Sequence, residues 1–119
     1  PKILKKCNLP LTSVRRVEAW IEAHHAEPTA LEDLAAVAGT SARGLQLAFQ
    51  RHRSLSPMAA LTQRRLQAAK ALLEQPAAAT TVTTVALDVG FCHPGRFAAR
   101  YRAAFGELPS ETLARGRRR

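Results

Sequence analysis

Acidic side chains are scarce in this 119-residue sequence. It holds 9 Asp and Glu against 18 Lys and Arg, which gives a formal net charge of +9 at pH 7. Five of the nine acids precede Leu34, so the basic surface belongs to the later two thirds of the chain. This balance suits a polyanionic partner, with nucleic acid the first candidate and an anionic membrane surface the second.

Long hydrophobic runs are also absent. No stretch approaches the roughly 18 apolar residues that a membrane span requires, and no hydrophobic signal segment opens the chain. These absences argue against membrane insertion and export and favour the cytoplasm. The chain begins at Pro1 rather than Met, which suits processing or excision from a longer protein.

Cysteine is limited to Cys7 and Cys92. The two could pair, but without a secretory context two free thiols are expected. A zinc site needs about four ligands, and neighbours such as His24 and His25 point in different directions on a helix. The sequence offers no convergent nucleophile, base or metal set, so we expect no catalytic residue, no metal and no cofactor.

What the sequence does contain is one pattern, present twice. An apolar helix ends in Ala, a Gly follows four residues later, and a second helix rich in Arg or Gln begins shortly after. Ala35 with Gly39, and Ala86 with Gly90, mark the two copies. Gly supplies the positive φ that lets the first helix end and the second leave at a steep angle. The spacing predicts two helix-turn-helix motifs.

Capping residues and prolines set the expected boundaries. The expected caps are Thr12 or Ser13, Thr29 with Glu32 in a capping box, Ser41, and Ser56 before Pro57, with a further helix beginning near Thr81. The predicted fold is all-α, with about seven helices and two helix-turn-helix subdomains on a long connector helix. Its parts are a flexible basic leader (1–11), a first lobe (12–55), the connector (56–75), a second lobe (76–115) and a basic tail (116–119).

Apolar residues at helical spacing predict the core. Phe97, Tyr101 and Phe105 recur every four residues, which favours a buried stripe over a platform for stacking bases. Trp20 lies on the apolar stripe of the first helix and is expected to anchor the core. The connector should bury a wide band made of Met58, Leu61, Leu66, Ala69, Leu72 and Leu73.

Polar residues share one face of the helix that follows the first turn. Arg43, Gln46, Leu47 and Gln50 stand at i, i+3, i+4 and i+7. Taken alone, such a stripe is an ordinary solvated surface. The preceding turn favours a different interpretation, because it sets this helix across its partner as a reader of nucleic acid.

Further residues extend the pattern over about 14–115. They are Ser41, Arg43, Leu45 and Phe49; Ser56, Pro57, Arg65, Leu66, Ala69, Leu72 and Leu73; then Gly90, Phe91, Phe97, Tyr101, Phe105, Gly106, Pro109 and Ser110. This set resembles the DNA-binding domain of AraC/XylS-type transcriptional regulators. The sequence departs from that family at Gly95, where Ser is frequent, and at Pro94, Ala98 and Ala99, where polar residues are frequent. It departs again at Leu47, often Arg in the family, and at Ala60, often Tyr.

The resemblance implies sequence-specific binding of duplex DNA to regulate transcription. Arg43, Gln46 and Arg96 are then the expected base contacts, since Arg pairs with guanine and Gln with adenine through two hydrogen bonds. The expected phosphate contacts, which position without specifying, are Ser41, Arg51, Arg64, Arg100 and Arg102. For Arg64, together with Arg65 and Lys70, structural ion pairing between the lobes is the alternative.

The implied partners are promoter or operator DNA, RNA polymerase, and an effector-sensing domain in a longer parent chain. The implied location is the bacterial cytoplasm, on the nucleoid and away from the membrane. A single chain should place two recognition helices in successive major grooves. The charge alone also permits a non-specific or architectural nucleic-acid-binding protein, which would bind scrambled sequences with similar affinity.

Overall fold

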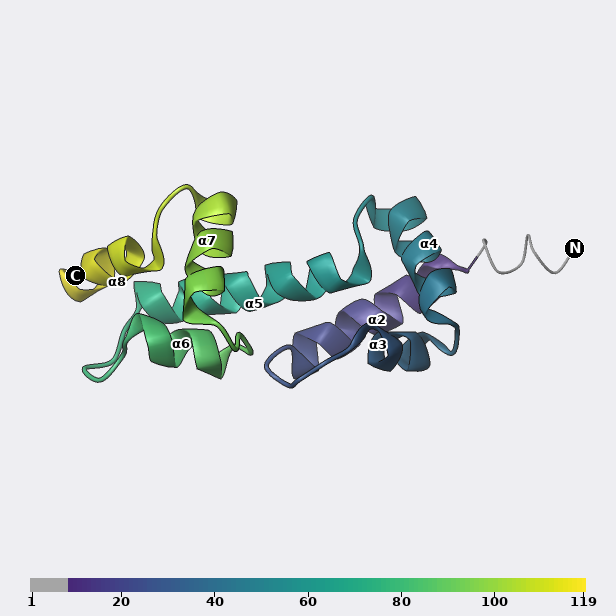
Figure 1. The fold of residues 1–119 in the computed structure, drawn as a ribbon, viewed down its shortest axis with the longest axis horizontal. Coiled ribbons are helices and arrows are strands. Elements are labelled where there is room, and N and C mark those ends of the chain that lie inside the picture. Colours follow the sequence, from purple (N-terminus) through teal and green to yellow (C-terminus); the bar gives the residue numbers. More distant parts are fainter. Residues whose placement is uncertain (1–8) are drawn as a thin grey trace, which may run out of the picture. The chain divides into compact units, whose positions relative to one another are not determined.

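The computed structural model describes residues 9–119, and these form seven helices and no strand (Figure 1). The helices are α2 (Leu11–His24), α3 (Leu31–Ala38), α4 (Ala42–Arg53), α5 (Pro57–Glu74), α6 (Val82–Asp88), α7 (Pro94–Phe105) and α8 (Pro109–Arg117). The all-α prediction is confirmed. Most of the expected leader lies outside the described residues, but Leu11 already belongs to α2. None of the helices described is long and apolar enough to cross a membrane.

The chain divides into two compact units, residues 1–62 (unit 1) and 63–119 (unit 2). The division falls inside α5, which contributes Leu61 to the core of unit 1 and Leu66 to that of unit 2. Each unit therefore encloses a hydrophobic core of its own, with one helix-turn-helix motif built around each.

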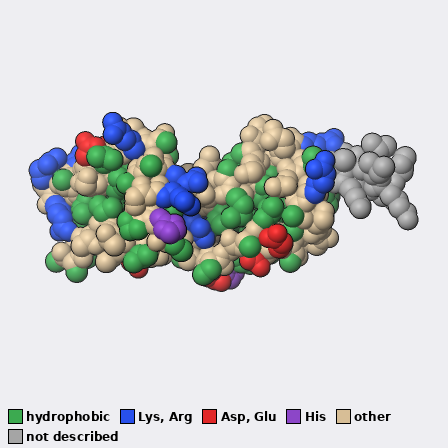
Figure 2. Space-filling view, viewed as in Figure 1, with side chains coloured by type: hydrophobic (Ala, Val, Ile, Leu, Met, Phe, Trp, Pro, Cys, Tyr) green, Lys and Arg blue, Asp and Glu red, His purple; other side chains and the backbone are tan. Residues whose placement is uncertain are grey.

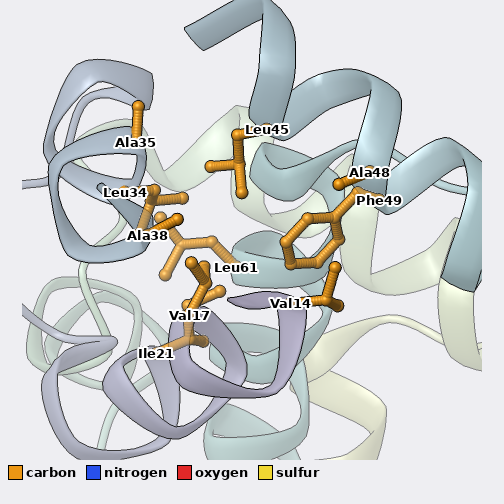
Figure 3. Close-up of a cluster of buried hydrophobic side chains, with 10 residues drawn as sticks. All are labelled: Val14, Val17, Ile21, Leu34, Ala35, Ala38, Leu45, Ala48, Phe49 and Leu61. Atoms are coloured by element: carbon orange, nitrogen blue, oxygen red, sulfur yellow. The ribbon is translucent and has the colours of Figure 1, made fainter. Parts of the chain in front are cut away.

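The core of unit 1 is formed by α2, α3, α4 and the start of α5 (Figure 3). Its buried residues are Val14, Val17, Ile21, Leu34, Ala35, Ala38, Leu45, Ala48, Phe49 and Leu61. Trp20 is half-buried against this cluster, so the prediction that it anchors the core is confirmed. Its ring stacks on His24 with 4.7 Å between centroids.

The core of unit 2 contains the aromatic stripe of α7. Phe97 and Tyr101 are fully buried, with ring centroids 5.7 Å apart. Phe105 is half-buried, and its ring lies 4.7 Å from that of Tyr101. The prediction that this stripe is core is confirmed. The buried apolar band on α5 is narrower than predicted, because Leu72 is not part of it. Leu73 is buried, whereas Leu72, one residue earlier, faces outward with 45% of its surface exposed.

Two of the predicted N-terminal caps are wrong. α2 begins at Leu11 with Pro10 at the cap, so Thr12 and Ser13 already lie inside the helix. Proline suits this place, since its fixed φ and missing N–H conflict with a helix interior but not with its edge. The amide of Ser13 donates to the Pro10 carbonyl at 3.0 Å, which closes the first turn without a side chain.

The expected capping box of Thr29 and Glu32 is displaced by one residue. The Thr29 hydroxyl donates to the Glu27 carbonyl at 2.8 Å, so it does not cap the helix. α3 instead begins after Ala30, whose amide donates to Asp33 Oδ2 at 2.8 Å. Asp33 thereby becomes the third helical residue and supplies the carboxylate that the box requires.

The predicted caps Ser41 and Ser56 are confirmed by hydrogen bonds to their hydroxyl oxygens, and Thr81, near which a helix was expected to begin, caps α6 in the same way. Gly44, Ala59 and Thr84 donate their amides to Ser41, Ser56 and Thr81 respectively, each at 3.1 Å. These bonds fix where α4, α5 and α6 begin.

Both predicted turns are present. Gly39 has φ 70°, and the amide of the next residue, Thr40, donates to the Ala35 carbonyl at 3.0 Å. Gly90 has φ 105°, and Phe91 donates to the Ala86 carbonyl at 2.8 Å. Glycine suits these positions because a Cβ disfavours positive φ. The same bonded turn therefore ends the first helix of each motif.

A chain of hydrogen bonds joins α7 to α8 inside unit 2. The Tyr101 hydroxyl donates to Thr112 Oγ1 at 2.8 Å, and Thr112 donates in turn to the Glu107 carboxylate. Arg115 donates to both oxygens of Glu107, at 3.0 and 2.7 Å. The bonds from Arg115, and then that from Thr112, lower the pKa of Glu107 from 4.5 to about 2.

We expect this carboxylate to make unit 2 sensitive to acid. Because the folded pKa lies below the unfolded one, the ionised group stabilises the fold above about pH 4.5 and loses that contribution as the pH falls towards 2. Glu107→Gln should therefore lower the melting temperature at pH 7, and the difference from the wild type should shrink progressively below pH 4.5. Thermal unfolding followed by circular dichroism between pH 7 and 2 measures it, with exposed Asp88→Asn as the control. A difference that stays constant with pH would contradict the assignment.

α8 continues further than the sequence suggests. Gly116 and Arg117, placed in a basic tail by the sequence analysis, belong to this helix. A Cβ on Gly116 would lie 2.5 Å from the Leu73 carbonyl oxygen, so α8 packs directly on the backbone at the end of α5. Arg117 donates to the Thr80 carbonyl.

Candidate nucleic-acid interface

The first candidate reading helix is α4, which carries its apolar and polar residues on opposite faces. Leu45, Ala48 and Phe49 are buried in unit 1. Arg43, Gln46 and Gln50 are exposed, with Leu47 half-buried beside them, as the spacing predicts. The packing of the buried face fixes which side chains the helix offers to a partner.

The start of α4 is suited to an anion. Ser41 is exposed and accepts the amide of Gly44 at its hydroxyl oxygen, which leaves the hydroxyl hydrogen to donate elsewhere. The first amides of a helix carry a partial positive charge that attracts phosphate. Both features lie at the N-terminus of α4, next to Arg43, the first residue of the polar stripe.

The second candidate reading helix is α7, which offers cations but few other polar groups. Arg96, Arg100 and Arg102 are exposed. Gly95 and Ala99 are also exposed, and Ala98 is half-buried. His93 occupies the cap position, yet its side chain makes no capping hydrogen bond. Hydrogen bonding from the start of α7 therefore depends chiefly on arginine.

The structure separates arginines that are engaged within the fold from those that face outward. Arg53 and Arg115 form close ion pairs with Glu18 and Glu107, respectively. Within residues 9–119, by contrast, the following have no hydrogen-bond or ion-pair partner: Arg43, Arg96, Arg100 and Arg102. All four of these outward-facing arginines are among the predicted DNA-contact residues. Figure 2 shows basic side chains over both units and few acidic ones on the face displayed.

The cations of α5 and the end of α4 are engaged more closely with the protein. Arg64 and Arg65 are half-buried and, like the exposed Arg51, interact with other residues. Burial lowers the pKa of Arg65, an effect that Cys92 opposes. Lys70 lies 4.8 Å from the centroid of the Phe105 ring, a cation–π contact inside unit 2 that the sequence analysis did not anticipate.

Sequence reasoning also missed the ion pair of Glu18 and Arg53. The two residues are 35 positions apart, so no local rule connects them. The spacing places Arg53 on the side of α4 that carries Gln46, seven residues earlier, but it does not indicate Glu18 as the partner. Among residues 9–119 there is no group of three or more His, Cys, Asp or Glu that could hold a metal ion.

Comparison with known proteins places this geometry in a class. A family model described as a helix-turn-helix domain matches residues 34–115. The chain is 43% identical over 100 residues to the XylDLEGF operon transcriptional activator 2 of Pseudomonas putida, which covers 83% of this chain and 64% of the relative. It is 43% identical over 102 residues to another XylDLEGF operon transcriptional activator of that organism, covering 85% of this chain and 32% of the relative. The chain thus spans less than two thirds of the length of either relative. These matches place the chain in the class of helix-turn-helix DNA-binding domains.

Solved structures narrow the class to a family. A probable AraC family transcriptional regulator from Rhodopseudomonas palustris is 50% identical, with a TM-score of 0.83 over 88% of this chain and 97% of that one. The DNA-binding domain of AdpA, solved in complex with a target DNA, is 30% identical, with a TM-score of 0.78 over 86% and 90% of the two chains. This chain belongs to the AraC/XylS family of DNA-binding transcriptional regulators. The similar proteins described above are transcriptional regulators rather than enzymes.

Proposed function

We propose that this domain recognises a specific sequence of duplex DNA as a single chain and so regulates transcription. The observation that carries the proposal is the presence of two helix-turn-helix motifs in one chain, each on its own core and each with an outward-facing arginine on its second helix. Two reading helices in one chain correspond to two successive major grooves, about 10 bp apart. The two helices differ in sequence, so the site is non-palindromic.

In this proposal Arg43 and Gln46 of α4 contact bases in one groove. Their exposure on a common face supports the assignment, as does the capacity of Arg for guanine and of Gln for adenine. Arg96 contacts a base in the next groove. Because Gly95 and Ala99 carry no hydrogen-bonding side chain, α7 should contribute less to base reading than α4.

The phosphate contacts hold the two helices in register without choosing the sequence. Ser41 and the first amides of α4 bind one phosphate, supported by the available hydroxyl hydrogen. Arg100 and Arg102 flank α7 and are exposed. Arg51 and Arg64 complete the proposed set.

The wider setting is also a proposal. The chain spans about a third of several P. putida activators, which is consistent with an effector-sensing domain elsewhere in a longer parent protein. Regulation of a promoter would bring the domain close to RNA polymerase on the bacterial nucleoid. The names of the relatives, which are operon activators, support activation of transcription as the mode of action.

Selection of bound fragments from a random DNA pool tests the function directly. We expect one enriched asymmetric sequence with two conserved blocks about 10 bp apart, and a footprint on one side of the duplex with one chain per site. The block contacted by α4 should be the more strongly conserved. An inverted repeat that requires two chains would contradict the single-chain arrangement.

The same selection distinguishes the rival function. The net charge of +9 would allow a non-specific or architectural nucleic-acid-binding protein. Such a protein would enrich no sequence and would bind scrambled duplexes as tightly as any selected one.

A further inference from the structure

Each of the three guanidinium nitrogens of Arg53 donates a hydrogen bond within the protein. Its Nε donates to Glu18 Oε2 at 2.7 Å, and its Nη2 donates to Glu18 Oε1 at 2.9 Å. The remaining nitrogen, Nη1, donates to the His52 carbonyl at 3.2 Å. The two side chains are about one third exposed, 32% for Arg53 and 36% for Glu18. A two-point pair of this kind fixes the orientation of the guanidinium as well as its position.

Arg53 stands on α4 where an outward-facing cation would border the reading face. It follows Gln46 by seven residues and Gln50 by three, and these spacings place side chains on one side of a helix. A long arginine at this position could reach a neighbouring phosphate if nothing held it. Glu18 of α2 holds it instead, and no other carboxylate contributes to the raised pKa of Arg53.

We propose that Glu18 sets the background affinity of this domain for DNA of any sequence, by pairing with Arg53 and withholding that cation from the phosphate backbone. The inference rests on the proposed function, in that α4 must face DNA. Each phosphate that a cation neutralises strengthens binding to all sequences alike and makes it more sensitive to salt. A regulator must find one site among a great excess of others, so a lower affinity for random DNA leaves more of it available to its target.

The test compares three variants in salt titrations on the selected duplex and on a scrambled one. Glu18→Gln keeps the shape of the side chain but removes the charge, so Arg53 becomes able to turn to a phosphate. We expect its affinity for the scrambled duplex to rise about five- to tenfold at 0.1 M salt, with a salt slope steeper by about 0.9. The gain on the selected duplex should be similar.

Glu32→Gln is the matched control, because it removes the same charge from an exposed carboxylate of unit 1 that has no hydrogen-bond or ion-pair partner among residues 9–119. It should raise affinity for the scrambled duplex by less than about twofold, since no additional phosphate is contacted. A gain equal to that of Glu18→Gln would overturn the proposal, because net charge alone would then explain both.

The double variant Glu18→Gln with Arg53→Met leaves the net charge at the wild-type value. If Arg53 is withheld from DNA in the wild type, the salt slope of this variant should equal that of the wild type. A slope lower by about one would show that Arg53 already contacts phosphate, and would overturn the proposal. This variant can still overturn the proposal if Glu18→Gln alone proves unfolded by circular dichroism.

These results are separable from those that test the proposed function. Equal binding of the wild type to selected and scrambled duplexes would overturn sequence-specific recognition. The comparison of salt slopes would still report whether Glu18 withholds Arg53.

Discussion

Phe49→Ala should destabilise unit 1 by about 3 to 5 kcal/mol. Phe49 is fully buried among α2, α4 and α5, next to Val14 and Leu61 (Figure 3). Truncation removes the ring and leaves a cavity that the surrounding side chains fill only in part. Because whole domains are stable by only about 5 to 15 kcal/mol, a loss of this size should unfold unit 1 at moderate temperature.

The destabilisation caused by Phe49→Ala can be assigned to one unit because the sequence has a single tryptophan and a single tyrosine, one in each unit. Trp20, the single tryptophan of the sequence, packs against the core of unit 1, and Tyr101, the single tyrosine, lies in unit 2. Tryptophan fluorescence therefore reports the unfolding of unit 1, whereas far-ultraviolet circular dichroism reports helices of both. In Phe49→Ala we expect the fluorescence transition to move to lower temperature while part of the helical signal persists.

Phe97→Ala provides the reciprocal variant in unit 2, and exposed Leu87→Ala the control for a lost surface side chain. Phe97→Ala should leave the tryptophan transition close to that of the wild type. Identical shifts of both signals in both core variants would show that the two cores unfold together, in conflict with their separate packing.

The second large effect is that of salt on DNA binding. A protein that neutralises roughly 6 to 10 phosphates loses about 10³ to 10⁵ in affinity between 50 and 200 mM salt. The proposed contacts of this domain are Ser41, Arg51, Arg64, Arg100, Arg102 and the first amides of the reading helices. With Arg53 and Arg115 already paired to carboxylates, we expect a loss near 10³, at the lower end of that range.

Two substitutions should divide this affinity into positioning and reading. Arg100→Ala should weaken binding to selected and scrambled duplexes by similar factors and lower the salt slope by about one. Arg43→Ala should cost about 1 to 3 kcal/mol on the selected duplex and relax the preference at one base. Titrations of both variants on both duplexes measure this. Equal losses for the two variants on scrambled DNA would remove the distinction between the two arginines.

The sequence predicts features that depend on a few neighbouring residues. The turns at Gly39 and Gly90 follow from the need for positive φ, and the cap at Ser41 follows from an amide three residues away. The burial of Phe97 and Tyr101 follows from helical periodicity. Each of these rests on interactions within about one helical turn, which a spacing rule captures.

The features that sequence reasoning missed depend on competition or on distant partners. Thr29 was a plausible cap, but the Glu27 carbonyl takes its hydroxyl and Asp33 replaces Glu32. The pairing of Glu18 with Arg53 requires α2 to pack beside the end of α4, which is set by the fold of the whole unit. The contact roles proposed for Arg43, Gln46 and Arg96 remain predictions.

The small residues on α7 give this helix a capacity for change. Apart from its chain neighbours and the backbone of α7, a Cβ placed on Gly95 would meet nothing within 4 Å, and Ala99 is exposed nearby. A larger side chain can therefore be introduced here without disturbing the core beneath, which is formed by Phe97 and Tyr101. Under the proposed role of α7 as a reading helix, side chains added at these positions would change which bases it contacts while folding is preserved. We would therefore begin at α7 to redirect the domain to a different DNA sequence.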